Sequence, residues 1–390
     1  MADRPLLNPL TWATDDDYTG GAEPATPTKV TPSTGKRAQG WEPIEKPAAQ
    51  HMNALLGNLA GWADYYRDLD WLNTQLITDA AVTNSEILRA MASLPEVLSP
   101  SGPYLTAVGE TGNVFFSYDG ISWGHNAGVG VVVSHHKALV WSPLASLWIL
   151  GAAASDADEI MTAAESDATW TARNDPAADA NRNGIAESGS IIVMCRGAGG
   201  FVTSPDGITW TERTHPATNK NLLSVVWTGS QFVAVGELST ILTSSDGITW
   251  TDRTGSAPTG MRFNDVAWDP NASLLCAVGQ ETGPENGEIF TSPDGITWTQ
   301  RLSYTSSEIF SIVRVGGALF ACGYNTINGV ARNFVAKSLD GGINWERQGI
   351  PGNTADATTA RCVFEGGRFV IFWDDGGSDL FYRAGPRVSL

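Results

Sequence analysis

The segment from Asp179 to Glu187 has the residue types and the spacing of a cation site. Oxygen-bearing side chains fill its first, third, fifth and ninth positions, and glycine fills the sixth; the ligand candidates are Asp179, Asn181, Asn183 and Glu187. This pattern matches the first half of a calcium-binding loop. The twelfth position is Ser190, where such a loop carries a glutamate. A loop holding structural Ca²⁺ and an ordinary polar loop are therefore both open interpretations.

A short motif recurs from residue 117 onward and divides this part of the chain into units. The heptapeptide Ser204–Trp210 recurs unchanged at 292–298, with one change at 244–250, and more loosely at 117–123 and 338–345. The closing tryptophans fall at 123, 170, 210, 250, 298 and 345, so the steps are 47, 40, 40, 48 and 47 residues. Periods of this length with strand-like content are typical of β-propeller blades.

The unit from Leu222 to Thr254 shows the expected content of one blade. Apolar and β-branched runs predict strands over 222–228, 231–236, 241–244 and 249–253, separated by turn residues. A last unit without a motif runs from Thr358 to Arg383, whereas the first lacks a clear innermost strand, which the tail 387–390 would supply. The sequence thus predicts a mainly β protein with a seven-bladed propeller over residues 96–390; six or eight blades are the alternatives.

The repeated motif has the chemistry of a hairpin turn. Gly tolerates positive φ, Asp accepts hydrogen bonds from the turn amides, and the closing Trp is expected to pack between blades. Ser338, Asp340, Gly342 and Trp345 fit the form Ser-x-Asp-x-Gly-x-x-Trp, which resembles the Asp-box, or BNR repeat, of sialidase-like propellers. The resemblance covers residues 104–385 and implies structural roles for these residues: Asp119, Trp123, Asp206, Trp210, Asp246, Trp250, Asp294, Trp298, Asp340 and Trp345.

The same resemblance raises the question of glycosidase chemistry. It implies an arginine triad, a Tyr–Glu nucleophile pair and an acidic general acid. No tyrosine of the chain can be matched to a glutamate partner, and the recurring arginines keep a fixed distance from the motif tryptophans: Arg173, Arg213, Arg253 and Arg301. We expect these arginines to pair with outer-strand acids such as Glu212 and Asp252. The sequence therefore predicts no catalytic residues.

Strand direction locates a candidate ligand-binding face. The motifs connect the third and fourth strands of each blade, so the loops between the second and third strands lie on the opposite face. The first residues of these loops align as a polar set that differs from blade to blade: Glu110, Arg196, Glu237, Gln280, Tyr324 and Asp374. Variation on a repeated frame is typical of recognition surfaces. Plain solvation of loops is the alternative interpretation.

Composition excludes some classes of function. The net charge of −18 disfavours nucleic acid as a partner, because a binder of its backbone needs a basic surface. We expect no transmembrane helix, no membrane insertion and no secretory signal, since the apolar stretches are short and the N-terminus has no apolar core. The four cysteines, Cys195, Cys276, Cys322 and Cys362, stand in strand-like runs and are expected to be buried thiols.

The first 95 residues differ in composition from the repeats. Residues 1–46 contain an acidic run, paired glycines and scattered prolines, which predict an extended arm. Residues 47–95 place apolar side chains from Met52 to Leu94 at alternating steps of three and four, which predicts a helical stalk with a coiled-coil seam. The bulky seam residues Trp62 and Tyr66 favour a homotrimer. An amphipathic helix lying on the propeller is the alternative.

The segment around this helix start resembles the N-terminal region of many bacteriophage tail-fibre proteins. The residues concerned lie within 25–70 and include Gly40-Trp41, Lys46-Pro47, Asn53 and Trp62. The resemblance implies a virion structural protein, assembled in the host cytoplasm, whose arm binds other tail proteins. We expect a tail fibre or receptor-binding component whose propeller adheres to a host-surface glycan or protein, or contacts another virion protein. The alternatives are a sialidase-like hydrolase of host polysaccharide and a purely architectural decoration protein.

Overall fold

The protein is described by a computed structural model in two separate units, residues 1–73 and Thr74–Leu390. The described residues all belong to the second unit and are 74–76, 88–93, 105–109, 114–117, 123–126, 138–151, 160–164, 169–176, 181–197, 200–216, 220–283, 285–315, 317–327, 330–349, 359–365, 368–374 and 380–384. The extended arm expected over 1–46 therefore lies outside the described residues. So does the segment 387–390, which we expected to close the ring.

The described part of the chain is made almost entirely of antiparallel strands. The strands before residue 220 are β1 (Thr74–Leu76), β2 (Leu88–Ser93), β3 (Leu105–Gly109), β4 (Val114–Ser117), β5 (Trp123–Asn126), β6 (Ala138–Ser142), β7 (Leu147–Gly151), β8 (Ile160–Ala163), β9 (Thr171–Arg173), β10 (Arg182–Glu187), β11 (Ile192–Arg196), β12 (Phe201–Ser204) and β13 (Thr211–Arg213).

The remaining strands continue the same pattern. They are β14 (Leu222–Trp227), β15 (Phe232–Gly236), β16 (Ile241–Ser244), β17 (Thr251–Asp252), β18 (Met261–Asp269), β19 (Leu274–Glu281), β20 (Gly287–Ser292), β21 (Thr299–Tyr304), β22 (Ser307–Val315), β23 (Ala318–Ile327), β24 (Val330–Ser338), β25 (Glu346–Gly349), β26 (Thr359–Glu365), β27 (Arg368–Asp374) and β28 (Leu380–Ala384). The described ranges contain a single 3-10 turn, η3 (Thr254–Ser256), and no helix that is long and apolar enough to cross a membrane.

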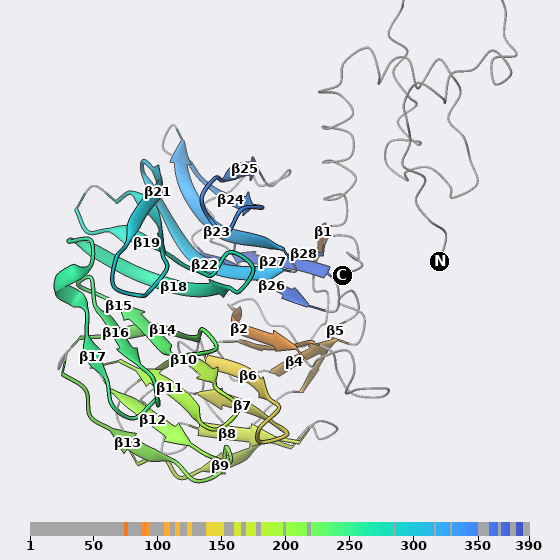
Figure 1. Cartoon of the computed structure of the whole chain (residues 1–390). Coiled ribbons are helices and arrows are strands. Elements are labelled where there is room, and N and C mark those ends of the chain that lie inside the picture. Colours follow the sequence, from red (N-terminus) through yellow and green to blue (C-terminus); the bar gives the residue numbers. More distant parts are fainter. Residues whose placement is uncertain are drawn as a thin grey trace, which may run out of the picture. The chain divides into compact units, whose positions relative to one another are not determined.

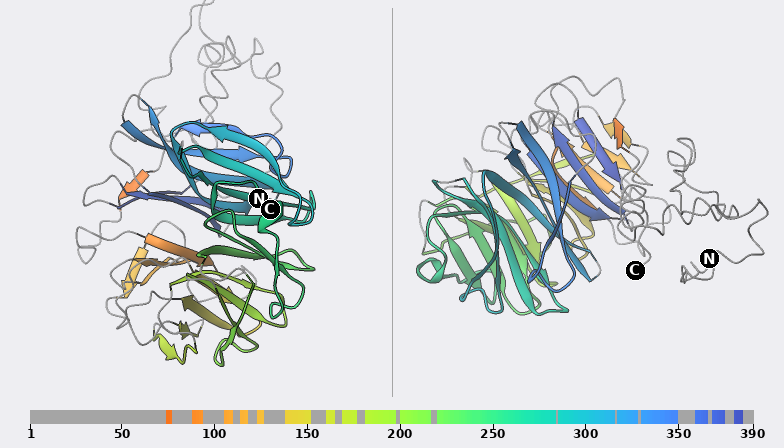
Figure 2. Two further views of the ribbon diagram at one scale, coloured as in Figure 1. Left: turned by 90° about the vertical axis from the view of Figure 1, so that its left-hand side faces the viewer. Right: turned by 90° about the horizontal axis from the view of Figure 1, so that it is seen from above.

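These strands form seven described sheets of four strands each (Figure 1). Six sheets follow chain order, from β2–β3–β4–β5 to β22–β23–β24–β25. The first strand of each sheet contacts the first strand of the next, from β2 through β6, β10, β14, β18 and β22 to β26, and β26 contacts β2. The two further views in Figure 2 show the sheets following one another around this circuit. The architecture is that of a β-propeller.

The remaining sheet combines strands from both ends of the described chain. Its order is β26–β27–β28–β1 (Figure 1). β1 pairs with β28 so that Thr74 lies opposite Arg383. The strands expected over 368–373 and 379–382 are present as β27 and β28. A segment from the N-terminal side thus supplies the outermost strand of this sheet.

The helix expected over residues 47–95 is wrong at both places where that range is described. Residues 74–76 form β1, and residues 88–93 form β2, the innermost strand of the first sheet that was missing from the sequence analysis. Leu, Arg, Ala and Met, which dominate β2, favour helices in isolation, but pairing with β3 overrides this preference. The compact unit that contains these sheets spans Thr74–Leu390.

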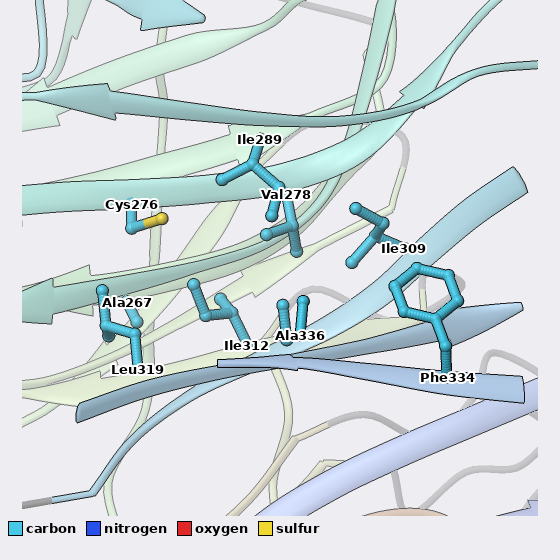
Figure 3. Packing of buried hydrophobic residues seen from close by; sticks show 10 residues of the cluster. Ala267, Cys276, Val278, Ile289, Ile309, Ile312, Leu319, Phe334 and Ala336 are labelled. Atoms are coloured by element: carbon cyan, nitrogen blue, oxygen red, sulfur yellow. The ribbon is translucent and has the colours of Figure 1, made fainter. Parts of the chain in front are cut away.

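The hydrophobic core lies between neighbouring sheets. In one layer, shown in Figure 3, Ala267, Cys276, Val278 and Ile289 of one sheet meet a second set from the next sheet: Ile309, Ile312, Leu319, Ala321, Phe334 and Ala336. Cys195, Cys276 and Cys322 are buried and form no disulfide, as expected; the side chain of Cys362 lies outside the described part. Neither face of a sheet can be exposed without uncovering such a layer, so each sheet needs both neighbours.

Candidate binding face

In each sheet the first strand begins on the face of the propeller opposite the repeated turns. The second strand ends on the same face. Five of the described sheets carry a bulge at the same place in the first strand, at Arg89, Asn183, Leu223, Asn264 and Phe310. A bulge bends its strand and re-aims the side chains around it. The residues just before these bulges therefore share one location on the candidate face.

Glycines at the ends of the second strands allow this arrangement. Gly236, Gly279 and Gly323 lie opposite the first strands, and a Cβ atom on any of them would come within 2.0 Å of a main-chain oxygen of Asn221, Arg262 or Glu308, respectively. No side chain fits at that distance. The residues that follow these glycines, Glu237, Gln280 and Tyr324, thus emerge beside Asn221, Arg262 and Glu308.

Arg196 does not occupy the same position as these three residues. It pairs with Arg182, as Gly236 pairs with Leu222, so the residue equivalent to Glu237 is Gly197. The main-chain N–H of Gly197 donates to the carbonyl of Asn181 at 2.8 Å, as that of Glu237 donates to Asn221 at 2.9 Å. The predicted alignment was therefore displaced by one residue at Arg196, which stands where five other sheets have glycine.

A continuous polar network crosses three sheets on this face. Arg262 lies between Glu237, with Nε 3.7 Å from Oε1, and Glu308, with Nη1 3.5 Å from Oε1. Asn221 donates to Glu237 Oε2 at 2.8 Å, and Asn264 donates to Glu308 Oε1 at 3.1 Å. The side chains of Arg262 and Glu237 are 37% and 36% exposed, so the network is open to ligands.

Arg262 has hydrogen-bonding capacity that the protein leaves unused. Its Nε has no hydrogen-bond partner, and both carboxylates lie at or beyond the outer limit of a hydrogen bond. A guanidinium offers five N–H donors in a rigid fork. With carboxylate acceptors on both sides, this site can exchange hydrogen bonds with a ligand that carries hydroxyl or amide groups.

Tyr324 adds an aromatic surface next to the network. It lies directly opposite Glu308 across β22 and β23, and its ring is 5.7 Å from that of Phe310. Burial, followed by the charges of Glu308 and Glu285, raises the pKa of the Tyr324 hydroxyl. The hydroxyl therefore remains a neutral donor and acceptor at physiological pH.

The structure brings together part of the predicted face. Glu237 forms one end of the network, and Tyr324 lies opposite Glu308 at its other end. Gln280 lies opposite Arg262 in the strand register. Glu110 and the side chain of Asp374 lie outside the described part, although the main chain of Asp374 ends β27. The network partners in or next to the first strands were not predicted: Asn221, Arg262, Asn264 and Glu308. Their signal is a polar residue within or next to an otherwise apolar strand.

The described members of the predicted calcium loop lie within or next to a strand. Residues 182–187 form strand β10, in which side chains alternate between faces, and Asn183 and Glu187 are about 13 Å apart at the usual rise per residue. Asn183 donates to the carbonyl of Leu222 at 2.6 Å, whereas Glu187 accepts from Ser142 and from the N–H of Leu144. Asn181 precedes the strand, and Asp179 lies outside the described residues. Among the described residues, no group of three or more His, Cys, Asp or Glu could hold a metal.

The repeated turns have the predicted local geometry. In one of them Asp206 accepts hydrogen bonds from the N–H groups of Ile208 and Thr209 at 2.9 and 2.7 Å, and Gly207 has φ of +71°. Trp210 packs between the second and third described sheets, and Trp250, Trp298 and Trp345 pack in later layers. In the described turns these residues hold the hairpin and pack between sheets; Asp119 and the side chain of Trp123 lie outside the described part.

The periodic arginines have partners other than those predicted. The Nε atoms of Arg173, Arg213, Arg253 and Arg301 each donate to a threonine on the neighbouring third strand, at 2.7 to 3.2 Å. Glu212 instead binds Arg196. These arginines belong to the repeated frame. They lie on outer strands and do not contribute to the Glu237–Arg262–Glu308 network.

Comparison with known proteins agrees with the fold. The class is the β-propeller, and the chain belongs to the family of the DUF6242 beta propeller domain, whose model matches residues 119–378. A solved structure of YCF48 bound to a D1 peptide is similar, with a TM-score of 0.58 and 15% identity over 81% of this chain and 95% of that one. An ancestral GH74 enzyme has a TM-score of 0.55 and 12% identity over 78% of this chain and 45% of that one. No curated protein sequence matches the chain.

Proposed function

We propose that this protein is a binding component of a bacteriophage virion, with the propeller as its recognition module. The observation that carries the binding role is the network of Glu237, Arg262 and Glu308, which is built from non-repeating residues on a repeated frame. We further propose seven blades, because the seven described sheets contact one another in a closed circuit. The turn geometry supports a relationship to Asp-box propellers.

The virion role rests on the sequence of the first 73 residues. The tail-fibre-like segment within 25–70 supports attachment of an N-terminal arm to other tail proteins, and apolar spacing within 47–73 supports a helical stalk that forms a homotrimer. The propeller then contacts a host-surface glycan or protein, and its mechanism is adhesion without a chemical step. The protein is thus located in the phage tail after assembly in the host cytoplasm.

Two experiments separate these claims. Immunogold electron microscopy of particles that carry this gene should place the chain on the tail, and particles without label would contradict the virion role. Fluorescently labelled full-length protein should bind host cells, and R262Q together with E308Q should reduce this binding at least about tenfold. R253Q is the matched control, because Arg253 directly follows the outer strand β17 and contacts Thr243. Equal binding by the double variant and the control would contradict the location of the site.

Glycan hydrolysis is the second candidate. It is favoured by the presence of two carboxylates, Glu237 and Glu308, on the same face and on either side of Arg262. A glycosidase needs two such groups flanking the scissile bond. Release of reducing sugar from host polysaccharide by the full-length protein, and its loss in E237Q and E308Q, would establish this activity. Binding without release would support adhesion.

A further inference from the structure

Two arginines face each other at one place in the propeller where the other sheets have none. Arg182 of β10 lies directly opposite Arg196 of β11. The equivalent pairs in the three following sheets are Leu222–Gly236, Phe263–Gly279 and Ile309–Gly323. The repeated frame therefore needs no charge at this position, and the two arginines are specific to one sheet.

Arg182, the arginine on the first strand of the sheet, is fully buried. Arg182 has 0% side-chain exposure and binds Asp175, which is 2% exposed. Placing two like charges directly opposite each other is unfavourable, and burying them adds a desolvation cost. Asp175 offsets the charge of Arg182. The charge of Arg196 therefore needs a second anion.

The outer arginine is held in place and reaches the surface. Arg196 lies across Gly200, where a Cβ atom would come within 2.3 Å of its Nε. Its side chain is 14% exposed, and its counter-ion Glu212 is 45% exposed on the outer strand β13. The Arg196 Nε is buried and has no hydrogen-bond partner. A positioned guanidinium thus has one exposed counter-ion and an unused donor.

We propose that Arg196, with Arg182 behind it, is a subsite for a carboxylate group of a ligand, and that Glu212 is the counter-ion that this ligand displaces. Glu212 shows which chemistry fits, because its own carboxylate binds the guanidinium there. A guanidinium edge matches the two oxygens of a carboxylate, so a ligand carboxylate can bind the guanidinium where that of Glu212 now does. The net charge of −18 provides no long-range attraction for such a ligand, so its recognition is local.

This inference deepens the proposed binding function by naming one chemical group of the ligand. The subsite is separate from the Arg262 network, because Arg262 already has a carboxylate on each side. A carboxylate-bearing ligand that spans the candidate face would contact both. The test below needs no host cell, and its failure would leave the cell-binding result of R262Q and E308Q unaffected.

The experiment uses full-length protein and sodium acetate as the probe. Thermal unfolding is followed while acetate replaces chloride at constant ionic strength. E212Q should bind acetate at least about tenfold more tightly than the unchanged protein, because the internal competitor is gone, and the midpoint should rise to saturation. E212Q/R196Q should show no saturable rise. E212Q/R196K, which keeps the charge and loses the planar fork, should bind more weakly than E212Q.

The controls separate binding from loss of structure. E212Q/R213Q keeps Arg196 and removes an outer-strand arginine that contacts Thr203, so it should respond to acetate as E212Q does. Circular dichroism in chloride checks that each variant is folded. If E212Q/R196Q is not folded, E212Q/R196K still tests the role of Arg196. An equal response in E212Q and the unchanged protein, or a response that survives E212Q/R196Q, would overturn the proposal.

Discussion

The hydroxyl of Ser224 donates a hydrogen bond of 2.7 Å to Oδ1 of Asp265, and this bond joins two neighbouring sheets. The same carboxylate accepts from the N–H of Val266 at 2.9 Å and, through Oδ2, from the N–H of Ile312 at 3.0 Å. Asp265 therefore ties together the first strands β14, β18 and β22. These are the strands that supply Asn221, Arg262 and Glu308 to the candidate face.

Replacing this carboxylate should loosen the circuit of first strands. In D265N the amide nitrogen must face one of the N–H or O–H donors, so at least one buried hydrogen bond is lost. We expect a loss of about 1–3 kcal/mol in the free energy of unfolding, measured by urea denaturation. D252N, on the outer strand β17, should change it by less than about 0.5 kcal/mol. Similar losses in both variants would contradict the bridging role.

The glycines that end the second strands should tolerate no side chain. In G279A the new Cβ would lie 2.0 Å from the carbonyl oxygen of Arg262, so the strands must separate. We expect a loss of about 3 kcal/mol or more, measured by thermal and urea unfolding. Gly255 is the matched control, because a Cβ there meets no atom within 4 Å. A fully stable G279A would show that this contact is not needed.

The repeated turns should make the propeller sensitive to acid. Hydrogen bonds from the N–H groups of Thr209 and Ile208 lower the pKa of Asp206. The N–H of Thr249, acting against burial, lowers that of Asp246. A lowered pKa in the folded state adds stability above the unfolded pKa of about 3.9, and this stability is lost as pH falls through the folded value.

The test compares unfolding midpoints from pH 6 down to pH 2. D206N/D246N keeps an oxygen acceptor in both turns but cannot be protonated in this range. The variant should therefore lose less stability than the unchanged protein as pH falls. D252N serves as the control for removal of an exposed carboxylate. Parallel curves for all three proteins would contradict a contribution from the turns.

Glu288 should show the opposite dependence on pH. Burial raises the pKa of its carboxyl group, and the charge of Glu281 acts in the same direction. Hydrogen bonds from Ser303 and Gln300 act against this rise. A raised pKa means that stability falls as pH rises through the folded value. E288Q should therefore be more stable than the unchanged protein at pH 7, with the difference shrinking at pH 4.

The E288Q comparison is direct because the substitution preserves the contacts. The new Oε1 can still accept from Ser303 Oγ, and the Gln300 amide can turn to present its oxygen. Thermal unfolding at both pH values gives the difference. A variant that is less stable than the unchanged protein at pH 7 would show that the carboxylate is favourable in its ionised form.

The features predicted well from the sequence depend on neighbouring residues in the chain. The strands expected in the unit 222–254 appear as β14 to β17, because each is an apolar run that ends at a turn. The Asp206 turn is also local, since its acceptor and donors lie within three residues. The packing of Trp210 between sheets follows from the repeat, because every blade needs the same contact.

The features that could not be predicted from the sequence depend on pairing between distant strands. β2 has helix-favouring residues and becomes a strand only because β3 lies beside it. Arg196 was misaligned because the glycine that marks the position elsewhere is replaced. The association of Glu237 with Arg262 and Glu308 joins three sheets, and no local pattern gives the register between sheets.

Pairing of β1 with β28 has a consequence for protein synthesis. Thr74 is synthesised long before Arg383, so β1 has no pairing partner in this sheet while the intervening sheets emerge from the ribosome. Each of those sheets can stack on its predecessor as it appears, but the circuit stays open until the last strands are made. The circuit of sheets therefore stays open on the nascent chain until β28 has emerged. Ribosome pausing just before β28 would prolong the stage most prone to aggregation.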